Sequence, residues 1–273
     1  MGKTILLTGA TDGIGLETAK MLAGEGHTLL LHGRSQSKLD AAASAVAAVQ
    51  GGNTVRTFSA DLGDLAAVAR LASDVAAAET RLDVLINNAG VFKLPGATTA
   101  GGLDLRFVVN TLAPYLLTRR LLPATPSTGR IINLSSAAQA PVSIDALCGR
   151  ATLDDNAAYA QSKLAITMWS RFLADELGPD GPAVIAVNPA SFLGSKMVEE
   201  AYGVAGEPLW IGADVLARAA LSDEFANASG QYYDNDRKRF GAPHPDAMDA
   251  QKNAALVVVL DELLAAQGIA ASP

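Results

Sequence analysis

The feature that most constrains this chain is a glycine-rich turn near its N-terminus, over residues 8–15. A short apolar, β-rich segment at residues 3–7 precedes the turn, and apolar residues recur over 16–23 at the spacing of an amphipathic helix. The start of such a helix presents unpaired N–H groups and a partial positive charge, both of which suit a pyrophosphate. The arrangement therefore predicts a dinucleotide site at the beginning of the chain.

The three glycines of the turn are Gly9, Gly13 and Gly15, which gives G-x-x-x-G-x-G instead of the general G-x-G-x-x-G fingerprint. On its own this spacing also suits an ordinary turn in any α/β protein, so later parts of the chain must decide. If a dinucleotide binds here, we expect the residues between the glycines to contribute to its site: Thr11, Asp12 and Ile14.

The end of the second predicted strand, residues 28–32, bears on which dinucleotide would bind. An NAD site carries Asp or Glu about 20 residues past the glycines, where it bonds the ribose hydroxyls. Here Gly33 takes that place and is followed by Arg34 and Ser35. Arg34 could bind a 2′-phosphate through a forked pair, with Ser35 as a further donor, although a solvated loop arginine is the alternative. The pattern favours NADP.

The third predicted strand, residues 54–58, is followed by Asp61 and Leu62, both candidates for the cofactor site. Asp61 could accept a bond from the adenine amino group. Equally, it could cap the helix predicted over residues 65–78, and the spacing alone favours the cap.

The fourth predicted strand, residues 84–86, ends in Asn87-Asn88-Ala89-Gly90. Open α/β sheets bind ligands at the carboxyl ends of their strands, so Asn88, Ala89 and Gly90 are candidate cofactor residues. Farther on, Asn110 lies inside a helix predicted over about 103–121. A buried amide there needs partners, because leaving it unpaired costs a few kcal/mol.

Two later segments carry hydroxyl and amine groups. The fifth predicted strand, residues 130–136, ends in Ser135 and Ser136. At the head of a long helix, Tyr159 and Lys163 are four residues apart and thus share one helix face. A solvated lysine on an amphipathic helix is the plainer alternative.

Strands and helices alternate through the sixth predicted strand, residues 183–187, which ends in Asn188-Pro189-Ala190-Ser191. This alternation predicts an α/β fold, namely a single Rossmann-type, doubly wound parallel sheet of about seven strands flanked by helices. The 273 residues contain no internal repeat, linker or low-complexity break, so we expect one domain over 1–273.

Composition narrows the possible partners. A formal net charge of −7 speaks against nucleic acid, and the lone Cys148 excludes an internal disulfide and favours a reducing compartment. No apolar run approaches the ~18 residues of a membrane span, and the N-terminus lacks the apolar core of a signal peptide. His27, His32 and His244 do not have metal-ligand spacing. We expect a cytoplasmic protein without metal, membrane or nucleic acid.

Taken together, the motifs resemble those of the short-chain dehydrogenase/reductase family. They are the Thr8–Gly15 turn, the Asn87–Gly90 segment, Asn110, Ser136 and Tyr159-x-x-x-Lys163, and they occur in the family's order over roughly residues 1 to 235. The resemblance implies an oxidoreductase that uses a nicotinamide cofactor. It also implies a homodimer or homotetramer joined through the long helices.

The proposed chemistry follows from a proton requirement. Hydride transfer to a ketone leaves charge on oxygen, which a proton donor must neutralise. A free phenol has a pKa near 10, and a neighbouring ammonium can lower it by about 1–3 units. We therefore expect Tyr159 to be the donor, with Lys163 lowering its pKa. The resemblance implies that Lys163 also binds the nicotinamide ribose.

The resemblance assigns two further catalytic residues. Ser136 would hydrogen-bond the substrate oxygen, and Asn110 would anchor a water that relays protons to Lys163. Ser135 is the alternative to Ser136, because a strand alternates its faces and only one of the two serines can point toward the cofactor.

Three features depart from the family pattern. Ser136 and Tyr159 are farther apart than in many members, and we expect the extra residues 137–156 to form a wall beside the pocket. Most members have Pro-Gly after the sixth strand, where this chain has Pro189-Ala190. The resemblance places Pro189 and Ser191 in the cofactor site, and Ser195 where members carry a threonine that binds the nicotinamide amide.

Residues 190–212 lie where family members carry a substrate lid. The stretch is rich in apolar side chains, although an ordinary amphipathic helix would explain about half of them: Phe192, Leu193, Met197, Val198, Tyr202, Leu209 and Trp210. An apolar lid suits a hydrophobic small-molecule ketone or secondary alcohol.

The sequence thus predicts an NADP(H)-dependent carbonyl reductase or secondary alcohol dehydrogenase. One alternative is a 3-ketoacyl-thioester reductase, for which only Arg119-Arg120 suggests a basic docking patch. Another is a non-catalytic NADP-binding regulator, against which the intact Ser136, Tyr159 and Lys163 speak.

Overall fold

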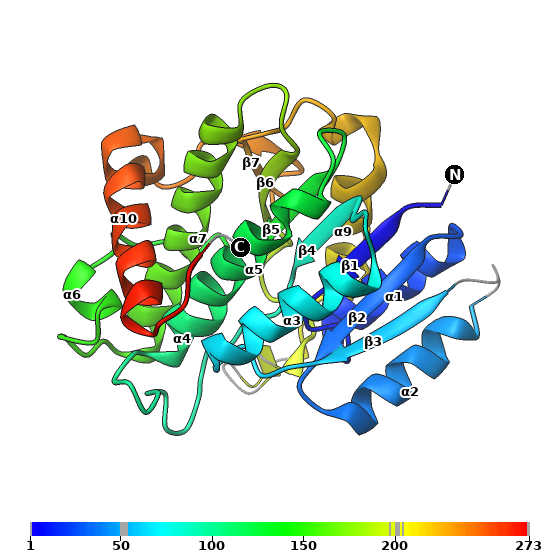
Figure 1. Cartoon of the computed structure of the whole chain (residues 1–273), viewed down its shortest axis with the longest axis horizontal. Helices are drawn as coiled ribbons and strands as arrows, with labels where there is room; N and C mark the ends of the chain where they lie inside the picture. The colour runs from blue at the N-terminus through cyan, green and yellow to red at the C-terminus, as the bar shows by residue number, and fades with distance from the viewer. Residues whose placement is uncertain (1, 50–53, 197, 200–202, 204, 272–273) are drawn as a thin grey trace.

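A computed structural model describes residues 2–49, 54–196, 198–199, 203 and 205–271 (Figure 1). In this part of the chain eight strands form one sheet in the order β3-β2-β1-β4-β5-β6-β7-β8. All neighbouring strands are parallel except β7 and β8. The predicted doubly wound parallel sheet is confirmed, with one antiparallel edge strand beyond the expected seven.

The strands agree with the predicted ones to within about two residues where a prediction was made. Their bounds are β1 Thr4–Leu7, β2 Thr28–Gly33, β3 Val55–Ser59, β4 Val84–Asn87, β5 Arg130–Leu134, β6 Ala183–Asn188, β7 Tyr232–Asp234 and β8 Arg239–Gly241.

Helices connect the parallel strands. Those longer than two turns are α1 Gly13–Gly24, α2 Gln36–Ala47, α3 Leu65–Ala78, α5 Ala113–Leu121, α7 Asp155–Leu177, α9 Trp210–Leu221 and α10 Ala250–Ala266. The shorter ones are α4 Leu105–Phe107, α6 Ile144–Leu147, the π-helical η1 Val108–Leu112 and the 3₁₀ turns η2 Leu122–Ala124, η3 Asp223–Phe225 and η4 Pro245–Met248.

Two apolar cores lie on opposite faces of the sheet, because side chains alternate along each strand. In β1, Ile5 and Leu7 point into the core shared with α1, α2 and α9, whereas Leu6 points into the core shared with α3, α5 and α7. All three side chains are fully buried. Buried strands of this kind fix the carboxyl edge of the sheet, where the predicted site residues lie.

Helix α10 packs on α7, as Figure 1 shows, and partly covers the long helices. Its Asp261 accepts a hydrogen bond from the hydroxyl of Tyr115 on α5 at 2.8 Å, and Arg120 donates to the carbonyl of Ala270 beyond α10. The resemblance implied subunit contacts through these helices. The predicted homo-oligomer stays a prediction.

The segment predicted as a substrate lid is described in part. Met197 and Tyr202 lie outside the described residues. Leu193 is buried, whereas Phe192 and Trp210 are 55% and 57% exposed. The predicted apolar surface is therefore only partly exposed to solvent, and the lid stays a prediction.

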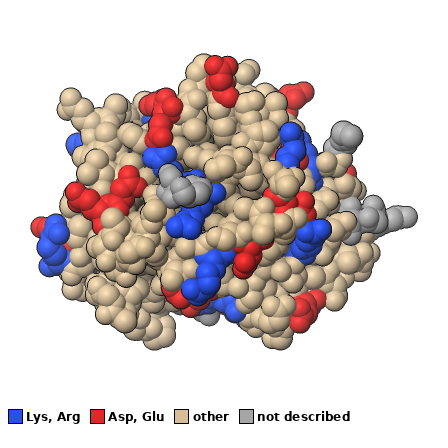
Figure 2. Space-filling model, in the orientation of Figure 1, with Lys and Arg blue, Asp and Glu red and all other residues tan. Residues whose placement is uncertain are grey.

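Acidic and basic side chains are intermixed on the face of the molecule seen in Figure 2. None of the described helices combines the length and the apolar character that crossing a bilayer requires.

Candidate active site

A cleft of about 600 Å³ lies along the carboxyl ends of the central strands, where an open α/β sheet binds its ligands. Most of the predicted site residues line it: Gly9, Thr11, Asp12, Gly13, Ile14, Gly15, Arg34, Asp61, Leu62, Asn88, Ala89, Gly90, Tyr159, Lys163, Pro189 and Ser195. Four predicted residues, Ser35, Asn110, Ser136 and Ser191, lie outside the described wall of the cleft.

The glycine turn needs its glycines for conformation and for space. Gly9 and Gly13 have φ of 67° and 55°, in the left-handed region that residues with a Cβ avoid. A Cβ at Gly15 would lie 2.2 Å from the carbonyl oxygen of Gly9. Beside Gly13 the nearest atom to such a Cβ is Ser195 Cβ at 3.9 Å, so the helix start is open to the cleft. These features fit a pyrophosphate.

Asn88 and Thr8 tie this turn to the end of β4. Asn88 Nδ2 donates to the carbonyl oxygens of Thr8 and Gly9 at 2.8 and 3.1 Å. Thr8 Oγ1 in turn accepts from the N–H groups of Asn88 and Ala89, both at 3.1 Å. The Asn88 side chain therefore holds the main chain of the glycine turn in place. Thr8 begins the predicted motif but was not among the predicted cofactor residues; its signal is a hydroxyl directly before the first glycine.

His32 contacts the main chain of the glycine turn. The N–H of Gly9 donates to its Nδ1 at 3.4 Å, and its Nε2 lies 3.1 Å from the carbonyl oxygen of Ala60. Both contacts are satisfied by a neutral ring with its proton on Nε2. Burial lowers the pKa of His32 to about 4, so the ring stays neutral at physiological pH. The sequence predicted no role for His32, which lacks the spacing of a metal ligand.

Asp12 connects the turn to the segment after β6. It caps α1 by accepting from the N–H of Gly13 at 2.8 Å, and it pairs with Lys196 at 2.8 Å. The hydrogen bond from Lys196 is the main reason that the pKa of Asp12 lies below its ordinary value. Both side chains are more than half exposed, so the pair is weak in energy.

Two cations stand at the far end of the cleft from Tyr159 along the sheet. Arg34 and Lys38 are exposed and line the cleft, one at the end of β2 and the other in the first turns of α2. Lys38 was not predicted; it lies in the first turn of the helix that begins two residues after Arg34. Ser35 precedes α2, where its hydroxyl lies 3.1 Å from that of Ser37.

The predicted cap of α3 is wrong. Asp64, directly before the helix, accepts from the N–H groups of Ala66 and Ala67, whereas Asp61 accepts from Gly63. An N-cap must lie immediately before the first helical residue, and Asp61 is three residues too early. Asp61 lines the cleft, and its contact with adenine stays a prediction.

Tyr159 and Lys163 lie on consecutive turns of α7 and both line the cleft. The ring of Tyr159 packs on Phe92 with 4.7 Å between centroids. Lys163 is buried, with Nζ 5.7 Å from the centroid of the Tyr159 ring and donating to the carbonyl oxygen of Leu134 at 2.8 Å. Burial lowers the pKa of Lys163 to about 8. The amine of Lys163 is therefore withdrawn from solvent beside the phenol.

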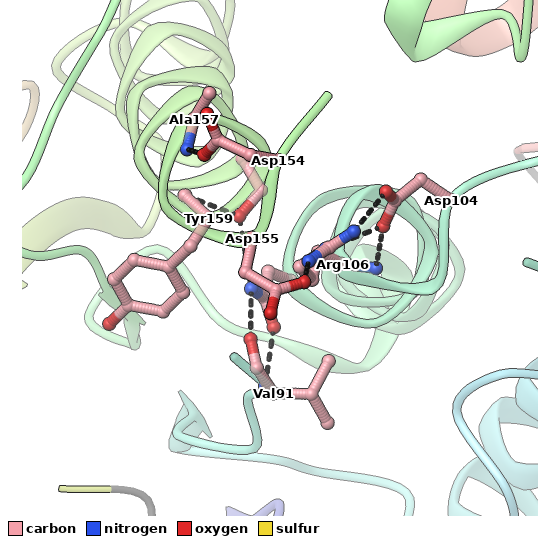
Figure 3. Close-up of polar contacts among 9 residues, drawn as sticks. Val91, Asp104, Arg106, Asp154, Asp155, Ala157 and Tyr159 are labelled. Carbon is pink, nitrogen blue, oxygen red and sulfur yellow. Dashed lines mark hydrogen bonds and ion pairs between the residues drawn. The ribbon is translucent and has the colours of Figure 1, made fainter. Parts of the chain in front are cut away.

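A buried arginine fixes the start of α7. Arg106 on α4 donates to both carboxylate oxygens of Asp104, at 2.9 and 2.6 Å, and also contacts Asp155 in the first turn of α7. Figure 3 shows the Tyr159 ring extending from α7 away from this cluster. Arg106 thus holds the helix that carries Tyr159. Arg106 was not predicted, because no local pattern connects it to Asp155, which is 49 residues away.

Asn110 lies in the π-helical turn η1, an irregularity often found at functional sites. Its amide exchanges two hydrogen bonds with the main chain of Val91, at 2.8 and 2.9 Å, and donates to Ser162 Oγ at 3.0 Å. Ser162 in turn donates to the carbonyl oxygen of Tyr159. The expected need for partners is confirmed, and the amide joins the loop after β4 to α7. The water relay stays a prediction.

The two serines after β5 have different surroundings. Ser135 is buried, and its hydroxyl contacts the carbonyl oxygen of Lys163 at 3.1 Å and the hydroxyl of Thr167 at 2.6 Å. Ser136 is half-buried, and its hydroxyl accepts from the N–H of Ala138. Ser135 also lines the cleft, whereas Ser136 does not. Which of the two serines meets a substrate therefore stays a prediction.

The loop after β6 adopts backbone conformations that glycine prefers. Ala190 has φ of 119° and Phe192 has φ of 53°. Ser191 donates to Asp236 from its N–H at 2.8 Å and from its hydroxyl at 2.7 Å. The predicted cofactor residue Ser191 therefore turns toward Asp236, whereas Pro189, two residues earlier, lines the cleft.

Comparisons with known proteins agree with this geometry. The profile of the short chain dehydrogenase family matches residues 3–203. Human retinol dehydrogenase 13 is 33% identical over 276 aligned residues, which cover 92% of this chain and 81% of that protein. The similar solved structures include the following two. A protein from Mycobacterium paratuberculosis has 28% identity and a TM-score of 0.78, over 96% of this chain and 92% of that chain. A metagenomic short-chain oxidoreductase in complex with NADP has 32% identity and a TM-score of 0.61, over 80% and 90%.

Proposed function

This chain belongs to the short-chain dehydrogenase family of oxidoreductases, and from that premise we propose that it is an NADP(H)-dependent carbonyl reductase or secondary alcohol dehydrogenase for hydrophobic substrates. The observation that carries the proposal is the pair of Tyr159 and Lys163. A phenol and a buried amine lie side by side on one wall of the dinucleotide cleft. A protein that only bound a nucleotide would have no need of a proton donor there.

The residues of the cleft fit NADP(H). The turn from Gly9 to Gly15 would hold the pyrophosphate, while Arg34 and Lys38 would meet the 2′-phosphate. At Gly33, where NAD enzymes carry a carboxylate, a Cβ would lie 2.5 Å from Thr11 Cγ2, so a side chain has little room. The NADP complex of the metagenomic relative supports the same choice. When bound, NADPH supplies the hydride that reduces the substrate carbon.

The chain's own residues carry out the proton transfer. In our proposal the Tyr159 hydroxyl gives its proton to the substrate carbonyl oxygen, and the ammonium of Lys163 stabilises the phenolate that remains. With a pKa of about 8, Lys163 is mostly protonated at neutral pH yet able to pass a proton on to the phenolate. Ser136 would donate a hydrogen bond to the same substrate oxygen. Oxidation of an alcohol reverses these steps.

The substrate side of the cleft is lined by apolar and aromatic groups, including Phe92, Leu94 and Val109. Such a lining suits a hydrophobic ketone or alcohol, and the human relative is named for retinol, an apolar alcohol. A thioester reductase is less well supported. The arginine that could have formed a carrier-docking patch, Arg119, instead pairs in a bidentate manner with Glu176.

The test is Tyr159→Phe, followed by the absorbance of reduced nicotinamide over a panel of small and bulky ketones, with NADPH and NADH side by side. Loss of the proton donor should lower kcat about 1000-fold for any ketone that the wild type reduces. Affinity for NADPH should stay within about twofold of wild type, because the phenol is not a phosphate ligand. A wild type that binds NADPH but reduces no ketone, with a variant that behaves identically, would favour the regulator.

A further inference from the structure

Ala190 occupies a conformation that its own side chain disfavours. Its φ of 119° lies in a region where a Cβ clashes with the main chain and which glycine enters freely. Alanine has no side-chain group that could form a local hydrogen bond to compensate. Such a conformation persists only where the surrounding structure imposes it.

Several hydrogen bonds on either side of Ala190 converge on one carboxylate. Asp236 accepts from the N–H and hydroxyl of Ser191, at 2.8 and 2.7 Å, and from Nδ2 of Asn188 at 2.9 Å. These donors flank the Pro189-Ala190 pair on both sides. The next residue back, Asn235, adds a bond from its Nδ2 to the carbonyl oxygen of Pro189 at 2.9 Å.

We propose that Asp236 is a positioning residue of the cofactor site: it clamps the loop after β6 and holds Ala190 in its strained conformation. The clamped loop carries Pro189 along the wall of the cleft and leads to Ser195, which approaches the open side of Gly13. The proposal rests on the proposed function in one respect, namely that a dinucleotide occupies this cleft.

The clamp comes from outside the segment that the family profile matches. Asp236 follows β7, whereas the profile ends at residue 203. A chain with glycine at position 190 would not need such a clamp, because glycine adopts this φ without strain. Asp236 therefore compensates, within this chain, for the alanine that stands after Pro189.

The proposal competes with a direct role for Ser191. If the Ser191 hydroxyl is a cofactor ligand, its removal weakens NADPH binding whatever residue stands at 190. If it serves the clamp, glycine at 190 makes it dispensable. The two roles are separated by comparing Ser191→Ala with Ser191→Ala/Ala190→Gly.

The main experiment uses Asp236→Asn, Ala190→Gly and the double variant of the full chain. Asp234→Asn is the matched control. Asp234 Oδ1 accepts from the same Asn188 and from the N–H of Asp236, and the amide oxygen of an asparagine can accept both bonds. One readout is hydrogen exchange, without nucleotide, of the Gly194 amide, which donates to the carbonyl oxygen of Glu207 at 2.7 Å. The other is NADPH affinity by calorimetry.

Asp236→Asn should speed Gly194 exchange and weaken NADPH binding, each about tenfold, because the loop relaxes when charge-assisted bonds are lost. Adding Ala190→Gly should return both to within about threefold of wild type, and Asp234→Asn should change neither by more than about twofold. If Asp236→Asn does not fold, Ser191→Ala removes one of the three bonds and takes its place.

The proposal is overturned if Asp236→Asn leaves Gly194 exchange unchanged, or if glycine at 190 brings no recovery. The second result would mean that Asp236 merely supports the β7–β8 hairpin, and exchange would then rise over residues 232–241 as well. Failure of the wild type to bind NADPH would instead remove the proposed function, while the exchange measurements would still decide the clamp.

Discussion

The loops after β1 and β6 border the same cleft and both enter the left-handed region of φ, yet they do so with different residues. The first loop has glycine at its two such positions, Gly9 and Gly13. The second has Ala190 and Phe192. Glycine meets the conformational requirement without strain, whereas the second loop requires an external clamp, which Asp236 supplies.

The two loops also differ in the groups that contact them. The first is enclosed by main chain and by largely buried partners, among them Asn88 and His32, and it has no space for a Cβ at Gly15. The second is held by an exposed carboxylate. We therefore expect the first loop to fail when side-chain volume is added and the second to fail when hydrogen bonds are removed.

The largest effect should come from Gly15→Ala. Its Cβ would lie 2.2 Å from the Gly9 carbonyl oxygen and 2.6 Å from Asn88 Nδ2, so either the helix or the turn must move. We expect NADPH affinity to fall about 1000-fold, or about 4 kcal/mol, as measured by calorimetry.

Gly13→Ala is the matched control for that experiment. Its φ of 55° imposes strain, but the nearest atom to its Cβ is 3.9 Å away. Its loss of affinity should be about tenfold. Equal losses in the two variants would show that φ strain, and not the lack of space at Gly15, governs the first loop.

Lowering the pH should destabilise the first loop but not the second, with an effect smaller than that of Gly15→Ala. His32 must stay neutral to accept from Gly9, and burial lowers its pKa from 6.5 to about 4. Because the unfolded chain protonates first as pH falls, stability is fully present above about pH 6.5 and is lost between pH 6.5 and 4. The total is about 3 kcal/mol. Burial opposes the shift, but hydrogen bonds from Ser191 and Asn188 hold the pKa of Asp236 below its ordinary value. Asp236 therefore stays ionised between pH 6.5 and 4 and continues to clamp the loop after β6.

Urea unfolding at several pH values measures this loss. His32→Asn keeps a donor and an acceptor but does not titrate, so its stability should decline less over the same window. A variant that declines as steeply as the wild type would remove His32 as the cause and leave the carboxylates as the explanation.

Sequence predicted those parts of the molecule whose signals are local. The three glycines lie within seven residues of one another, and Tyr159 and Lys163 are one helical turn apart, so spacing alone places each group on a shared surface. The strands were predicted for the same reason, since a fully buried parallel strand is a continuous apolar run.

Residues that act through distant partners were not predicted. Asp236 binds a loop 45 residues earlier, and Arg106 reaches Asp155 across 49 residues. His32 works through a main-chain N–H group that carries no side-chain signal at all. Ser191 was predicted as a cofactor ligand from the family pattern, which does not show that Asp236 lies next to it in space.

The smallest effect should come from Ala190→Gly alone, and its sign is opposite to that of the other variants. Relief of strain at φ of 119° should gain about 1–3 kcal/mol, and the greater entropy of glycine in the unfolded chain should take back about 0.5–1 kcal/mol. A net gain near 1 kcal/mol raises the Tm by about 2–4 °C in a protein of this size, measurable by calorimetry. Ala151→Gly, in an exposed bend with ordinary φ, lacks the strain and should lower the Tm slightly. If both substitutions lower the Tm alike, Ala190 is not strained, and the contrast between the two loops lies in their partners and not in their backbones.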